Sequence, residues 1–210
     1  MTLHRLIWPF IFLGIVLSLP GLPVPLGNLA IGLEGFDGYQ EGMAAISTDE
    51  SGTTLEIQIA YRGFGLDSIS YTFPREAMRS VSTTLTDAAW WRSRLLEMDV
   101  EQTVIRDTPP IMPKLVYAHR GHTYPFGSIE HTLQFVRQGR DYALLLTEIS
   151  PGADTRKSKE KTLPVFTIHI IGREIPYFRD IISEDNLSYV LTEYAAEKAA
   201  IETILSSSPQ

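Results

Sequence analysis

The chain has 210 residues, of which 44% are hydrophobic and 20% charged, which suits one globular domain with a buried core. The net charge of −7 argues against nucleic acid as a partner, because phosphate binding needs clustered Lys and Arg. No cysteine is present, which excludes disulfides, thiolate metal sites, a cysteine nucleophile and a lipid attached to cysteine.

The N-terminus has the pattern of a segment that directs a chain into or across a membrane. Arg5 precedes the uncharged run 6–19, LIWPFIFLGIVLSL, and the next basic residue is Arg62. Segments on the translocated side of a membrane are poor in Lys and Arg. We therefore predict an N-in, C-out orientation, with an extracytoplasmic domain that is either membrane-anchored or secreted.

Two interpretations of residues 1–33 stay open, a cleaved signal sequence and a retained anchor. As a helix, the run 6–19 is about 21 Å long, short of the roughly 30 Å of a bilayer core, which favours a signal. The nearest cleavage-like site, residues 28–30, is poor, and the proline-containing run 20–26 extends the apolar segment. A retained anchor would contact the membrane through residues 6–26.

The next segment, 34–52, is acidic and contains Gly35, Gly38 and Gly42, which predicts a linker. The folded domain is expected to span 53–206, followed by a disordered tail at 207–210. Alternating apolar residues in 55–61 and again in 69–73 predict a hairpin.

The segment after this hairpin has helical spacing. Thr86 is expected to cap a helix that carries Ala88, Trp91, Leu95 and Met98 on one face. The adjacent Trp90 and Trp91 cannot both face the core, so one of them is expected to be partly exposed. Core packing is favoured for this pair over a platform for stacking a ligand.

The middle of the chain allows two interpretations. Residues 115–118 predict a short strand, and 142–149 a largely buried one. Between them, Ser128 would cap a helix over 129–138 that ends at Gly139. The alternative is a hairpin over 132–149 that turns at 138–140.

The C-terminal third combines strands with one long helix. Residues 165–171 predict a strand, which Gly172 and Arg173 would turn into a second strand at 174–178. Ser183 is expected to cap a final helix whose apolar stripe runs from Leu187 to Leu205. Together these elements predict a single α+β domain with a mainly antiparallel sheet packed by two or three helices, preceded by an N-terminal hydrophobic helix.

Histidines provide the candidate site residues, because histidine is both a common metal ligand and a general base near neutral pH. The catalytic candidates are His119, Arg120 and His169, and the metal-binding candidates are His122, Glu130 and His131. His119 and His122 lie three apart at a strand end, which is not expected to put them on one face. Loop and surface positions are the favoured account of these histidines, and no cofactor is expected.

Four short motifs, at 118–121, 130–132, 139–142 and 164–169, resemble the start of a glycerophosphodiester phosphodiesterase. The resemblance implies a (β/α)₈ barrel in which His119 and His169 are the acid/base pair and Glu130 lies near a metal. The positions of the family's metal carboxylates hold Leu144 and Leu146, and the chain after His119 is too short for a barrel of about 250 residues.

The sequence therefore predicts a membrane-tethered or exported binding or assembly domain without catalytic activity. Its expected partners are the membrane and another envelope or cell-surface protein. The alternative is a metal-assisted, phosphodiesterase-like hydrolase that uses His119 and His169.

Overall fold

The computed structural model describes residues 23–35, 38–60, 66–98, 103–138, 141–149, 155–157 and 162–206. The predicted hydrophobic helix and the tail at 207–210 lie outside these ranges. Of the helices that are described, none has the length and apolar character needed to cross a bilayer.

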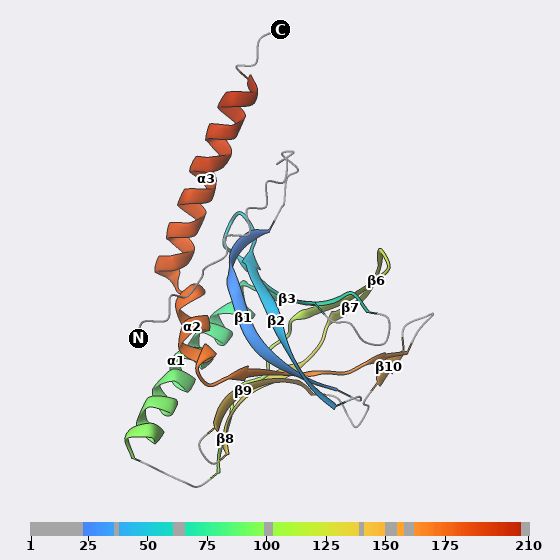
Figure 1. Ribbon diagram of the computed structural model, residues 1–210, viewed down its shortest axis with the longest axis vertical. Helices are drawn as coiled ribbons and strands as arrows, with labels where there is room; N and C mark the ends of the chain where they lie inside the picture. The colour runs from blue at the N-terminus through green and yellow to red at the C-terminus, as the bar shows by residue number, and fades with distance from the viewer. Residues whose placement is uncertain are drawn as a thin grey trace, which may run out of the picture.

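The described strands form one large antiparallel sheet with the order β5-β8-β9-β12-β1-β2-β3-β4-β6-β7 (Figure 1). A separate two-stranded ribbon pairs β10 with β11. The strands are β1 (Val24–Gly35), β2 (Gly38–Thr48), β3 (Thr54–Ala60), β4 (Ser68–Pro74), β5 (Val104–Asp107), β6 (Lys114–His119), β7 (His122–Ser128), β8 (His131–Gln138), β9 (Asp141–Glu148), β10 (Thr155–Lys157), β11 (Thr162–Pro164) and β12 (Thr167–Ile171).

Three described helices accompany the sheet: α1 (Arg75–Glu97), α2 (Glu174–Ile181) and α3 (Glu184–Ser206). Helix α1 packs against β3, β4 and β8, and α2 packs against α1, β1 and β12. Helix α3 begins beside α2 and β1 and then extends away from the sheet (Figure 1).

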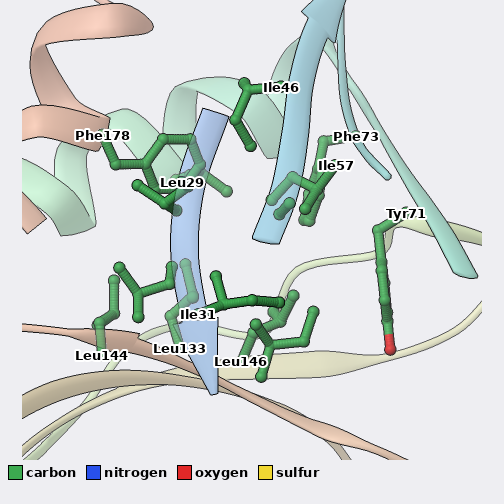
Figure 2. Close-up of a cluster of buried hydrophobic side chains, with 14 of the residues drawn as sticks. Leu29, Ile31, Ile46, Ile57, Tyr71, Phe73, Leu133, Leu144, Leu146 and Phe178 are labelled. Carbon is green, nitrogen blue, oxygen red and sulfur yellow. The ribbon is translucent and has the colours of Figure 1, made fainter. Parts of the chain in front are cut away.

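One face of the sheet supplies the core. Leu29 and Ile31 of β1 lie close to Leu144 of β9 and Phe178 of α2 (Figure 2). A hydrogen bond shows that the sheet also curls: the Tyr117 hydroxyl of β6 donates to the carbonyl of Pro164 of β11 at 2.7 Å. Pro164 lies only three residues before β12 begins, yet four strands separate β12 from β6 in the sheet order. The core therefore lies inside a curled sheet that the helices cover.

These observations confirm a single domain with an antiparallel sheet and helices packed on it. The boundaries at 33 and 52 are wrong, because residues 24–35 and 38–48 are paired strands in the middle of the sheet. In β1 the core side is apolar, while the opposite side holds Ala30, Gly32 and Glu34. Residues 24–33 were therefore predicted as part of the apolar N-terminal region, and the glycines and acidic residues that follow gave 34–52 the composition of a linker.

The first helix begins earlier than predicted. Thr86 lies inside α1, where its hydroxyl donates to the Ser82 carbonyl at 2.9 Å, so it does not cap the helix. Four hydroxyl residues, Ser80, Ser82, Thr83 and Thr84, obscured the apolar face of the first turns. The expectation for the tryptophan pair is confirmed: Trp90 is 59% exposed, whereas Trp91 packs on Phe135 with ring centroids 5.6 Å apart.

The hairpin alternative for the middle of the chain is confirmed and the 129–138 helix is wrong, since β8 and β9 pair up to Gln138 and Asp141. The expected strand at 174–178 is also wrong. Residues of α2 such as Ile175 and Phe178 reach the core with helical spacing. Three predictions are confirmed: the hairpin of β3 with β4, strand β6 and the Ser183 cap of α3. In this cap the backbone N–H of Asn186 donates to Ser183 Oγ at 3.3 Å.

Candidate functional site: a pocket beside His169

The histidines predicted as site residues lie in three different settings. His119 and His122 are directly opposed across the hairpin of β6 and β7. Its two-residue turn is formed by Arg120 at φ 46° and Gly121 at φ 77°, which suits the left-handed turns of tight hairpins. Opposed residues of an antiparallel pair point to the same side of the sheet, so the expectation that these two histidines do not share a face is wrong.

His131 is a core residue. The residue is 1% exposed, and its Nδ1–H donates to the Ile129 carbonyl at 2.9 Å. Its ring is nearly perpendicular to the Tyr71 ring, with the two ring centroids 5.5 Å apart. Within the described ranges, His122, Glu130 and His131 belong to no group of three or more His, Cys, Asp or Glu residues arranged to hold a metal ion.

His169 lies on β12, and four strands separate β12 from β6, the strand of His119, in the sheet order. The Nε2–H of His169 donates to Glu34 Oε2 at 2.8 Å. Its ring is nearly perpendicular to the Tyr39 ring, with the two ring centroids 5.3 Å apart. The partner of His169 is therefore a carboxylate of β1, at a position that the sequence suggested was a linker.

A pocket of about 670 Å³ opens beside His169. Residues from the start of β2, from α1, from β8, β9 and β12, and from the turn after β12 line it: Tyr39, Arg92, Val136, Asp141, Tyr142, Ala143, Leu145, His169, Ile171, Gly172 and Arg173.

The floor of the pocket is apolar. Ala143 is paired with Val136 on one side and with Ile171 on the other, and Leu145 is paired with His169. Side chains alternate along a strand, so these residues point away from the core that Leu144 and Leu146 enter. An outward face of an antiparallel sheet is usually polar, and an apolar one indicates that something covers it.

The side chain of Tyr39, at the start of β2, lies beside this apolar floor and also lines the pocket. Its ring lies directly over Gly32, where an added Cβ would be 2.2 Å from Tyr39 Oη. Only a residue without a side chain at position 32 leaves room for the ring in this position. The absence of a side chain at Gly32 therefore allows the Tyr39 ring to lie directly against the strand, next to His169.

The opposite end of the pocket is charged. Arg92 of α1 and Arg173 of the turn after β12 line it together with Asp141. Arg173 Nε lies 3.4 Å from Glu174 Oε1, and the Arg173 side chain is 76% exposed. Arg92 Nε is buried and has no hydrogen-bond partner among the residues that the structure describes.

Sequence reasoning found only His169 among these pocket residues. One signal was available: the run YALLLTEI at 142–149 is apolar at consecutive positions, and both faces of such a strand must be covered. Tyr39 and Arg92 carried no comparable signal, because their position depends on the curl of the sheet.

A comparison with models of protein families, with curated proteins and with solved structures finds no match to this chain. The described residues also lack the parallel strands of the barrel that the motif resemblance implied, since the pairs within the large sheet are antiparallel. The geometry of the pocket is therefore the basis on which the function of this domain is inferred.

Proposed function

We propose that this domain is a binding domain that takes up a small molecule in the pocket beside His169. The observation that carries the proposal is the pocket itself, whose volume of about 670 Å³ lies within the usual range for small-molecule sites. Such sites combine an apolar lining with a few polar groups that orient the ligand, and this pocket has both.

The apolar floor supports binding rather than simple solvent exposure. Covering the outward side chains of Val136, Ala143, Leu145 and Ile171 removes apolar surface from water, at about 25 cal/mol for each Å². The polar ends, with His169 and Glu34 on one side and the two arginines on the other, would fix the orientation of the ligand.

We further propose that the domain is extracytoplasmic, either tethered or exported. The support is the uncharged run 6–19 behind Arg5 and the absence of Lys and Arg from 6–61. Contact with another envelope or cell-surface protein stays a prediction.

Filling the pocket tests the binding proposal. In Ala143→Trp a large ring occupies the floor, and Ala45→Trp places the same ring on an exposed, outward position of β2 that does not line the pocket. We expect the wild-type protein and Ala45→Trp to bind the neutral dye N-phenyl-naphthylamine at one site. We expect Ala143→Trp to weaken its binding by about tenfold or more, as measured by fluorescence titration.

Near-ultraviolet circular dichroism of each variant verifies that the fold is intact. Equal dye binding by folded Ala143→Trp and Ala45→Trp would contradict the proposal, as would absence of binding to the wild-type protein.

A further inference from the structure

The Nε atom of Arg92 is buried without a hydrogen-bond partner among the described residues, although the side chain as a whole is half-buried. An arginine side chain carries a charge at all physiological pH values and offers five donors. Leaving one of these donors buried and unsatisfied costs free energy, in the range of about 1–3 kcal/mol and more for a charged group. In the described part of the chain Arg92 Nε has no acceptor, and the side chain lines the pocket. An acceptor supplied by a ligand would remove this cost.

The charge at this end of the pocket is positive in an otherwise acidic protein. Arg92 and Arg173 line it together with Asp141, whereas the whole chain has a net charge of −7. Arg173 is also paired with Glu174, which does not line the pocket, so both cations face the pocket but only one carboxylate does. Arginines that face a pocket favour a ligand with a negative group, because a planar guanidinium binds carboxylates and phosphates with paired hydrogen bonds.

The apolar floor continues from this charged end toward His169. From Asp141 to Leu145 along β9 the distance is about 13 Å, at roughly 3.3 Å for each residue. Between them, Ala143 with its strand neighbours Val136 and Ile171 forms a surface without polar side chains. A short hydrocarbon body fits this length, with a charged group only at the arginine end.

We propose that the ligand is an anionic amphiphile whose carboxylate or phosphate binds Arg92 and Arg173 while its hydrocarbon body lies over Val136, Ala143, Leu145 and Ile171. This inference rests on the proposed function and adds the chemical class and the orientation of the ligand. It assigns Arg92 the role of headgroup binding.

Competition against the bound neutral dye measures how strongly the pocket prefers an anionic headgroup over a neutral or cationic one. Decanoate, decyl phosphate, decanol and decylamine share one hydrocarbon body and differ in the headgroup. We expect decanoate and decyl phosphate to displace the dye at concentrations at least about tenfold lower than decanol, the factor that one charge-assisted hydrogen bond supplies. Decylamine is expected to be the weakest competitor.

Matched variants locate the headgroup. Arg92→Gln is expected to bring decanoate to within about threefold of decanol, because the charge is lost while dye binding persists. Arg94→Gln, an exposed arginine of the same helix paired with Glu97, is expected to keep the full preference. Arg173→Gln is expected to lower the preference by a smaller factor, because the Arg173 side chain is exposed and already paired with Glu174.

Outcomes separate this inference from the proposed function. If the dye binds in the pocket but decanol competes as well as decanoate, or both Arg92→Gln and Arg173→Gln keep the wild-type preference, the anionic ligand is ruled out and the binding domain stands. If the dye does not bind, or Ala143→Trp leaves its binding unchanged, the binding domain itself is ruled out.

Discussion

At the scale of single residues, the turn between β2 and β3 depends on the Asp49 carboxylate. Its Oδ1 accepts hydrogen bonds from the amides of Thr53 at 2.7 Å and Thr54 at 2.8 Å. Its Oδ2 accepts from the Thr53 hydroxyl at 2.9 Å and from the Ser51 hydroxyl. Burial by itself would raise the pKa of Asp49, but these hydrogen bonds outweigh it and hold the pKa well below its ordinary value.

We expect Asp49→Ala to lower the free energy of unfolding by about 1–2 kcal/mol at neutral pH, because the turn loses its hydrogen-bond acceptor. A pKa that is lower in the folded state contributes stability above the unfolded pKa, and this contribution disappears as the pH falls through the folded value. The difference between the wild-type protein and Asp49→Ala should therefore shrink below about pH 4.

Urea unfolding at several pH values measures this difference, with Asp87→Ala on the exposed side of α1 as the control. A gap between the wild-type protein and Asp49→Ala that stays constant from neutral pH down to acid would show that the charged form of Asp49 is not what stabilises the turn.

At the scale of the elements, the neighbouring tryptophans of α1 separate packing from surface contact. Trp91 packs on Phe135 of β8 and joins the helix to the sheet. Trp90 faces the other way and stacks with Arg94, whose guanidinium carbon lies 5.7 Å from the ring centroid. The two residues are adjacent and of one type, so they form a matched pair.

Trp91→Ala is expected to lower the free energy of unfolding by about 2–3 kcal/mol, because it leaves a cavity between α1 and β8. Trp90→Ala is expected to cost less than about 1 kcal/mol, as is usual at exposed positions. Denaturant titration of both variants gives the comparison. Equal losses for the two would contradict the packing of Trp91 seen in the structure.

The elements also show where sequence patterns were sufficient. The hairpin of β3 with β4 was predicted because Leu55, Ile57 and Ile59 alternate cleanly with polar residues. The stretches that became β1 and β2 lack this contrast, since Ala30, Gly32 and Ala45 occupy outward positions. Local composition therefore predicted an apolar signal or anchor up to residue 33 and a linker at 34–52, where strand pairing forms the centre of the sheet.

At the scale of the whole molecule, the prediction concerns the side of the membrane on which the domain lies. We expect a phosphatase reporter that folds only outside the cytosol to be active when fused after Gln210 in the full chain. Deleting residues 6–19 should abolish this activity, because the apolar segment that directs translocation is lost. Reporter activity confined to the cytosol in the full-length fusion would contradict the proposed extracytoplasmic placement.

The sequence by itself determined the features that a few neighbouring residues specify: the strands with strict alternation, the Ser183 cap of α3 and the opposite orientations of Trp90 and Trp91. It also identified His169, but neither its partner nor the pocket beside it. Glu34 and His169 are 135 positions apart and meet only because β1 pairs with β12. Pairing between distant strands and the curl of the sheet depend on how all the apolar faces pack together, so only the tertiary structure decided them.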